Sequence, residues 1–219
     1  MQGARRRLKA LRPKVQSAFI VYVTPRESPV EQVDDSFEVV QVTRPDDPIV
    51  EKITARWQRP YARRMLEQGR GRVVVALKGG DPVGRIWEIF DDERSFLSGV
   101  PRVKLARGET FMFDLFVERE YRRSNIGMTM ADYFFELYEP GGPTEVIYGF
   151  ISYENAPSIL WHHSIGFNVA QTINYVAIGE RIKWKIPFSD VPRFGPMSRK
   201  GRHTDPDQQL FGTSLLPNL

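Results

Sequence analysis

The stretch DLFVEREYRRSNIGMTMADYFFE, residues 114–136, runs from the end of one predicted element into the start of another. It follows directly on ETFMF, and residues 109–117 together are rich in aromatic and branched side chains, which is typical of a buried central strand. From Gly127 onward, apolar residues recur at helical spacing to about Tyr138. Since the first N–H groups of a helix lack internal partners, this strand-to-helix junction suits an anion.

Two arginines lie in that junction, followed by two small polar residues, Ser124 and Asn125. Arginine adds charge-assisted donors, and small residues let backbone amides approach an anion closely. A basic turn in which Ser124 or Asn125 simply caps the helix is the ordinary alternative.

On the N-terminal side, the pattern predicts a strand, a helix and a hairpin. Residues 36–43 read as a strand, and a helix is predicted from Pro48 to about Gln68, ended by Gly69. Its apolar face would comprise Ile49, Ile53, Trp57, Tyr61 and Met65. RVVVALK and VGRIWEIF flank GGDP, the turn of a β-hairpin.

On the C-terminal side, a strand is predicted over residues 144–152 and a short helix over 155–164. Two late strands follow, at about 168–177 and 181–186. The alternation of strands and helices predicts an α+β domain.

Composition narrows the class of protein. With 219 residues, 41% of them hydrophobic, the chain can bury a substantial core. It has no stretch of eighteen apolar residues and no secretory signal pattern. The absence of cysteine excludes disulfides, thiolate metal sites and cysteine nucleophiles, and fits a cytoplasmic location. The histidines have no acidic companions at ligand spacing, so no metal is expected.

The predicted domain covers residues 31–187. Residues 1–30 form a basic N-terminal extension, whose first fourteen residues carry six cations and no acid. This segment is either a solvated tail or a patch for peripheral contact with anionic lipid or nucleic acid. The net charge is the only feature that favours nucleic-acid binding, so no specific nucleic acid is expected. Residues 188–219 read as an irregular tail.

The opening stretch, with NAPSILWHHSIGF at residues 155–167, resembles the GCN5-related N-acetyltransferase (GNAT) family, whose members move an acyl group from coenzyme A to an amine. The family's Arg/Gln-x-x-Gly-x-Gly/Ala loop corresponds to residues 122–127, with Asn125 in place of the first glycine. Asparagine tolerates positive φ, so the backbone turn can survive the exchange. The second motif, Asn-x-x-Ala/Ser-x-x-aromatic-Tyr/His followed by Gly-Phe, is present in register.

The resemblance implies a GNAT fold, a twisted mixed β-sheet flanked by helices, with its two central parallel strands splayed apart. It also implies acetyl-CoA, or a longer acyl-CoA, as co-substrate. Loop amides would bind the pyrophosphate, and strand amides with the second motif would bind pantetheine. The implied cofactor-binding residues are Leu115, Phe116, Val117, Arg122, Arg123, Ser124, Asn125, Ile126, Gly127, Met128, Asn155 and Ser158.

Two residues are candidates for proton transfer. His162 stands where many family members carry the tyrosine that protonates the departing thiolate, and an imidazole can donate near neutral pH. The alternative for His162 is a hydrogen bond at the helix end or packing beneath the sheet. Asp114, the acid inside the central strand, is the candidate base, by alternation on the face opposite Phe113 and Leu115.

Asp114 could instead be a surface or salt-bridged carboxylate near Arg85. Glu88, Glu109 and Glu154 are alternative bases, among which the residues do not choose.

The function implied by the resemblance is direct N-acyl transfer, with acetyl favoured, to an amine of a small molecule, peptide or protein. Two alternatives stay open. One is a non-catalytic acyl-CoA-binding sensor or interaction module of the same fold, and the other is a long-chain N-acyltransferase at the membrane face. A homodimer through the late strands stays open on fold analogy. The acceptor amine is left undetermined.

Overall fold

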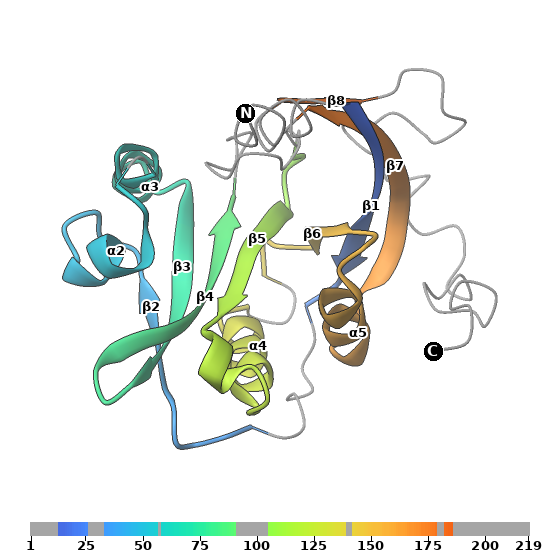
Figure 1. The fold of residues 1–219 in the computed structure, drawn as a ribbon. Coiled ribbons are helices and arrows are strands. Elements are labelled where there is room, and N and C mark those ends of the chain that lie inside the picture. Colours follow the sequence, from blue (N-terminus) through green and yellow to red (C-terminus); the bar gives the residue numbers. More distant parts are fainter. Residues whose placement is uncertain are drawn as a thin grey trace, which may run out of the picture.

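The computed structural model describes residues 13–25, 33–56, 58–90, 105–138, 142–178 and 182–185, with side chains described between residues 17 and 172. Its elements follow the chain in a mixed order of strands and helices (Figure 1). They are β1 (Pro13–Val23), β2 (Glu38–Val42), α2 (Pro48–Ile53), α3 (Arg59–Glu67), β3 (Gly71–Lys78), β4 (Asp81–Ile89), β5 (Glu109–Val117), η1 (Arg119–Tyr121), α4 (Ile126–Glu136), β6 (Val146–Ser152), α5 (Ala156–Ser164), β7 (Asn168–Ile178) and β8 (Ile182–Lys185).

The described strands form one mixed sheet of eight, in the order β2-β3-β4-β5-β6-β1-β7-β8. Neighbouring strands are antiparallel except at the centre, where β5 and β6 run parallel. A parallel pair needs a crossover connection, and α4 supplies it between these two strands.

Helices cover both faces of the sheet, and each face has its own apolar cluster. Val50 of α2 and Met65 of α3 pack on one face with Trp87 of β4. On the opposite face, Phe134 of α4 and Ile159 of α5 join a second cluster. The predicted α+β architecture with a mixed sheet flanked by helices is therefore confirmed.

The N-terminal extension predicted over residues 1–30 needs correction. Residues 13–23 form β1, which pairs with β6 on one side and with β7 on the other. Ala18, Ile20 and Val21 are fully buried there. The apolar run AFIVYV at residues 18–23 has the composition of a strand buried on both faces, so the sheet begins before residue 31. Residues 1–12, with most of the basic charge, lie outside the described residues.

The single helix predicted from Pro48 to about Gln68 is instead two helices. Thr54 is extended, at φ −117° and ψ 137°, which ends α2. Pro60 lies in the first turn of α3, where its missing N–H costs nothing, whereas a continuous helix would need that donor. The expected apolar face is broken accordingly, since Tyr61 is 51% exposed, and Trp57 lies outside the described residues.

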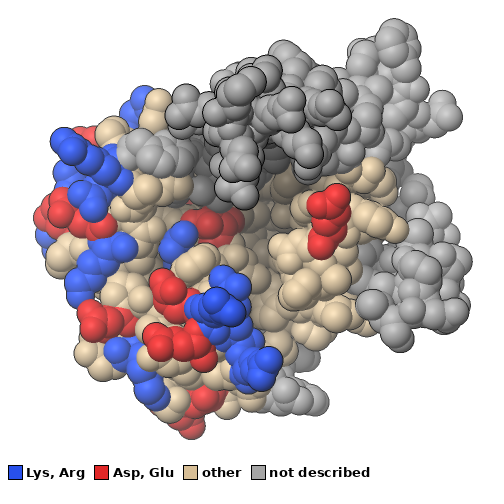
Figure 2. All heavy atoms as spheres, viewed as in Figure 1, with Lys and Arg blue, Asp and Glu red and all other residues tan. Residues whose placement is uncertain are grey.

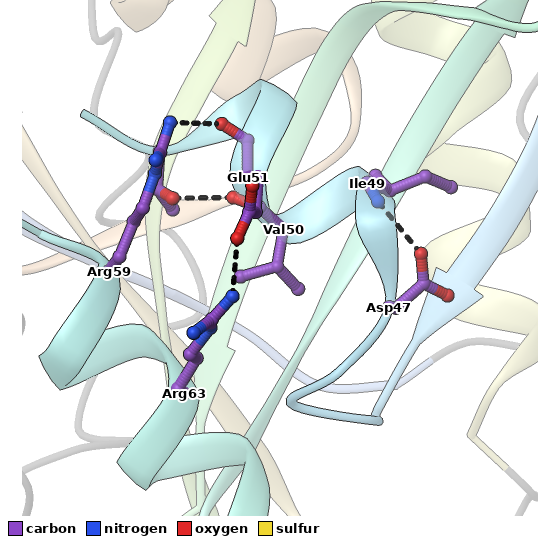
Figure 3. Close-up of polar contacts among 7 residues, drawn as sticks. Asp47, Ile49, Val50, Glu51, Arg59 and Arg63 are labelled. Atoms are coloured by element: carbon purple, nitrogen blue, oxygen red, sulfur yellow. Dashed lines mark hydrogen bonds and ion pairs between the residues drawn. The ribbon is translucent and has the colours of Figure 1, made fainter. Parts of the chain in front are cut away.

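Polar contacts hold the two short helices together (Figure 3). Asp47 caps α2 by accepting a hydrogen bond from the N–H of Ile49 at 2.9 Å. From α3, Arg59 donates to the carbonyl of Glu51 and Arg63 forms an ion pair with its carboxylate. These contacts fix α2 against α3 on the face that carries the first apolar cluster.

The remaining predicted elements agree with the structure to within a few residues. The hairpin turn between β3 and β4 is made by Gly79 and Gly80, whose φ values of 59° and 84° suit glycine. The strand predicted at residues 109–117 coincides with β5. The two late strands are β7 and β8.

Candidate active site

The two central strands separate where the predicted cofactor loop begins. The parallel ladder joins residues 109–112 of β5 to residues 146–149 of β6 and ends at the pair Met112 and Gly149. Beyond it, β5 continues to Val117 along β4, while β6 continues to Ser152 along β1. Figure 1 shows the two strands diverging toward α4 and α5. The predicted splay of the central strands is confirmed.

A β-bulge at Asp114 changes the direction of the side chains that follow it. Arg85 pairs with Phe116 and Trp87 pairs with Phe113, so two residues of β5 stand opposite one residue of β4. Asp114 has a φ of 51°, the one positive value at a non-glycine residue in the described part of the chain. A residue with a left-handed backbone conformation is typical of one class of β-bulge.

The alternation predicted along β5 is wrong beyond the bulge. Phe111 and Phe113 belong to the cluster under α2 and α3, as expected. Leu115 and Val117, however, pack with Met112 in the cluster under α4 and α5. The extra residue at the bulge reverses which face each later side chain occupies.

Asp114 forms a partly buried ion pair with Arg85. The distance between Arg85 Nε and Asp114 Oδ2 is 2.7 Å, and the guanidinium also lies 4.4 Å from the centre of the Phe116 ring. Burial raises the pKa of Asp114, and the charge of Arg85 opposes that rise. The salt-bridged carboxylate expected as one alternative is therefore what the geometry contains.

The loop from β5 to α4 places donors without internal partners at the helix start. Arg122 Nε donates to the carbonyl of Val117 at 3.0 Å, which folds the loop back onto the strand. Ser124 Oγ donates to the carbonyl of Tyr121 at 2.7 Å rather than capping α4. Asn125 is the N-cap residue, but its side chain makes no capping bond. The side chains of Ser124 and Asn125 thus leave the N–H groups in the first turn of α4 uncapped.

In the described part of the chain, the N–H groups of Asn125, Ile126 and Gly127 have no hydrogen-bond acceptor. Asn125 has φ −78°, so the positive φ proposed for it is not needed. Figure 2 shows lysine and arginine side chains gathered where α4 lies in Figure 1, beside a mainly uncharged surface over β6 and α5. The junction fits the anion site predicted from the sequence.

Gly127 is required by a close contact between α4 and α5. A Cβ at this position would lie 2.8 Å from Trp161 Nε1. That nitrogen is buried and makes no hydrogen bond to the described residues. Trp161 therefore packs against the first turn of α4.

His162 packs beneath the sheet. It is 4% exposed, and its ring contacts Trp161 and Phe167 edge-on. Nδ1 donates to the carbonyl of Ser158 at 2.7 Å, and Nε2 points toward Gly149 of β6. Burial lowers the pKa of His162 to about 4. Of the two roles expected for His162, this geometry corresponds to packing, because an imidazole that is neutral near pH 7 is a poor acid.

Asn155 and Ser158 are at the start of α5, just after the C-terminal end of β6, which does not pair with β5. Asn155 Oδ1 accepts a hydrogen bond from the N–H of Ser158 at 3.3 Å, so this asparagine caps the helix. Its side chain is exposed, and that of Ser158 is partly buried. Both residues lie on the same side of the sheet as the loop before α4.

The alternative bases are not brought together. Glu88 is fully buried beside Arg72 and Tyr138, a cluster that sequence reasoning missed. Glu109 is buried at the opposite end of β5 from the loop. Glu154 is exposed next to Asn155. Only Glu154 is near the predicted cofactor residues.

The described residues contain neither a metal-binding group nor a membrane-spanning helix. No group of three or more histidine and carboxylate side chains is placed to hold a metal ion there. None of the described helices is long and apolar enough to cross a membrane.

Comparison with known families agrees with this geometry. The family model of the "Acetyltransferase (GNAT) family" matches residues 37–167, more than half of the chain. The chain belongs to the GNAT acetyltransferase family. The matched region of this GNAT chain runs from just before β2 to just after α5. It therefore contains the point where β5 and β6 diverge, the loop before α4 and both sequence motifs. A comparison with curated proteins found no significant match.

Solved structures share the fold at low sequence identity. A tandem GNAT protein from the clavulanic acid biosynthesis pathway is 14% identical, with a TM-score of 0.51 over 78% of this chain and 52% of its own. A GCN5-related N-acetyltransferase from Sphaerobacter thermophilus is 14% identical, with a TM-score of 0.50 over 83% and 58%. A Drosophila protein is also 14% identical, with a TM-score of 0.50 over 85% and 59%. The chain thus spans little more than half the length of these structures.

Proposed function

We propose that this GNAT-family chain transfers an acyl group, with acetyl favoured, from coenzyme A directly to an amine of a small molecule, peptide or protein. The observation that carries the proposal is the divergence of β5 and β6 beside the uncapped start of α4. Phe116 and Val117 pair with β4 on one edge, and no described strand pairs with their other edge, so that edge can bond pantetheine as an added strand does.

The loop and the first turn of α4 would hold the pyrophosphate. The open N–H groups of residues 125–127 point along a helix dipole that favours negative charge, and Met128 follows in the same turn. Arg122 and Arg123 are exposed and supply positive charge. Ser124 keeps the turn compact by bonding the carbonyl of Tyr121. Asn155 and Ser158 would contact pantetheine from α5.

The reaction needs a neutral amine, a polarised thioester carbonyl and a proton for the departing thiolate. The amine nitrogen forms a bond to the carbonyl carbon, the carbon–sulfur bond breaks, and the proton lost by nitrogen ends on the thiol. We assign the binding and deprotonation of the amine to Asp114. Its carboxylate lies at the bulge where β5 leaves β6. A cationic amine would compete with Arg85 for that carboxylate and lose its proton there directly or through water.

His162 is not assigned the proton-donor role, because its Nδ1 proton is bonded to Ser158 and its Nε2 faces β6. Solvent can supply the proton to the thiolate, and positioning of the amine would then provide most of the rate. His162 instead supports Ser158 and the turn that carries Asn155.

A titration of the purified full chain with acetyl-CoA and longer acyl-CoAs, followed by free-thiol release with a panel of amines, tests the proposal. Binding together with amine-dependent thiol release is the expected result. An absence of acyl-CoA binding would overturn it. The length of acyl chain that binds best tests the long-chain alternative, whose basic segment lies mainly outside the described residues.

A second candidate, a non-catalytic acyl-CoA sensor or interaction module, is supported by two observations. Asp114 is held by Arg85, and His162 is buried and neutral. Acyl-CoA binding without thiol release across the amine panel would favour this candidate over the enzyme.

A further inference from the structure

A cavity of about 450 Å³ opens at the beginning of β5, far from the predicted cofactor loop at its end. Its wall includes Arg72, Tyr138 and Thr110. At about 3.3 Å per residue, the nine-residue strand separates the cavity from the loop by roughly 25 Å. The bulge at Asp114, where the proposed chemistry takes place, is four residues or roughly 13 Å beyond Thr110, so binding of a small ligand in this cavity is separate from acyl transfer. The volume is within the range of small-molecule sites, roughly 300–1,000 Å³.

Arg72 is a guanidinium held in place with much of its hydrogen-bonding capacity unused. It is 9% exposed, and its Nε donates to Glu88 Oε2 at 2.7 Å. The guanidinium carbon lies 4.9 Å from the ring centre of Tyr138 and 5.3 Å from that of Phe90. Within the described part of the chain, neither of its Nη nitrogens has a hydrogen-bond acceptor.

Glu88 fixes the orientation of Arg72 but balances its charge incompletely. The Glu88 side chain is completely buried, and its second oxygen accepts a hydrogen bond from the hydroxyl of Tyr138. Burial raises the pKa of Glu88 to about 7, with the charge of Arg72 opposing the rise. The raised pKa means that burial opposes the charged form of Glu88, which weakens its balance of the Arg72 charge and favours an anion at the cavity.

The walls indicate which class of anion fits. A guanidinium edge presents two parallel N–H donors that match the two oxygens of a carboxylate. The rings of Phe90 and Tyr138 offer apolar surface to the rest of a small organic molecule. Glu109 lines the same cavity and adds negative charge, which disfavours ligands with several negative charges such as polyphosphates.

We propose that this cavity binds a small organic monocarboxylate, whose carboxylate is received by the Nη groups of Arg72 and whose apolar part lies against Phe90 and Tyr138.

Calorimetric titration of the full chain with benzoate, phenylacetate and butyrate tests the proposal, with benzamide, phenylacetamide and butyramide as neutral matches and inorganic phosphate as a second anion. At least one carboxylate should bind, and its amide should bind at least about tenfold more weakly, because a charged bidentate pair is lost. Equal binding of acid and amide, stronger binding of phosphate, or no carboxylate binding at millimolar concentration would overturn the proposal.

Variants locate the site. Arg72→Lys keeps the charge but loses the paired donors, and it should weaken carboxylate binding by about tenfold. Thr144→Phe fills the cavity without touching the ion pair, so it decides the question if Arg72→Lys does not fold. Arg64→Lys makes the same chemical change on exposed α3 and should leave the affinity unchanged. Undiminished binding by Thr144→Phe and by folded Arg72→Lys would place the carboxylate elsewhere and refute the assignment.

Discussion

Asp114 of β5 and Arg85 of β4 are joined by an ion pair, with 2.7 Å between Asp114 Oδ2 and Arg85 Nε, at the residue where β5 bulges. The same position combines a left-handed backbone, a raised carboxyl pKa and the start of the gap between β5 and β6. Backbone conformations of this kind persist where the surrounding structure imposes them, and they concentrate at functional sites. The bulge therefore links the strand register to the proposed chemistry.

The backbone at Asp114 can be tested through stability alone. Asp114→Gly and Asp114→Ala both remove the ion pair, but only alanine has a Cβ that opposes a φ of 51°. Asp114→Gly should be more stable than Asp114→Ala by about 1 kcal/mol in urea unfolding. A more stable Asp114→Ala variant would contradict the left-handed bulge.

The proposed role of Asp114 in binding and deprotonating the amine predicts a kinetic loss. Asp114→Asn should lower kcat/KM for the amine by about a hundredfold, as removal of a positioned base does, with little change in acyl-CoA affinity. Glu154→Gln is the matched control, because this exposed carboxylate lies near the cofactor residues but on the surface. Equal kinetic effects of the two variants would remove Asp114 from the role.

The contact of Gly127 with Trp161 predicts an energetic coupling between α4 and α5. Gly127→Ala should lower the free energy of unfolding by about 1–3 kcal/mol, because its Cβ would lie 2.8 Å from Trp161 Nε1. In a Trp161→Leu background the same change should cost much less. Additive effects in this double-mutant cycle would show that the two helices do not meet as described.

The buried imidazole of His162 predicts a loss of stability in acid. Its pKa is about 4 in the folded protein and 6.5 when unconstrained, so the unfolded state binds the proton first as pH falls. Stability that is fully present above pH 6.5 should be lost progressively toward pH 4, by about 3 kcal/mol from this group.

Comparing wild type with His162→Gln by urea unfolding across this pH window isolates the effect, since Glu88 titrates in both proteins. The variant should lose less stability in acid. A pH dependence identical to wild type would contradict the burial of His162, and a large fall in turnover with unchanged acyl-CoA affinity would restore its role as proton donor.

The fold was predictable where local patterns determine it. The composition of residues 109–117 predicts β5, and Gly79 and Gly80 predict the hairpin turn. Pro60 was a readable signal that the predicted helix over residues 48–68 would break. The apolar run at residues 18–23 was a readable strand signal as well, although the basic residues before it favour a tail.

The site was less predictable, because it depends on contacts between distant residues. The bulge at Asp114 follows from the pairing of β5 with β4, which no pattern within β5 reveals. The burial of His162 depends on Gly149 and Phe167, which come from β6 and from the turn after α5. Arg72 and Tyr138 are 66 positions apart in the sequence and share no motif, so sequence reasoning had no signal for their cavity.

The most direct test of the central claim is a titration of isotope-labelled full chain with acetyl-CoA, followed through the backbone amide resonances. We expect the amides of residues 125–128 at the start of α4 and of residues 115–117 in β5 to shift together and to saturate. The amides of residues 109–112, which are within the closed ladder, should change little. Saturable binding that leaves the first two groups unshifted, or no binding, would contradict the account.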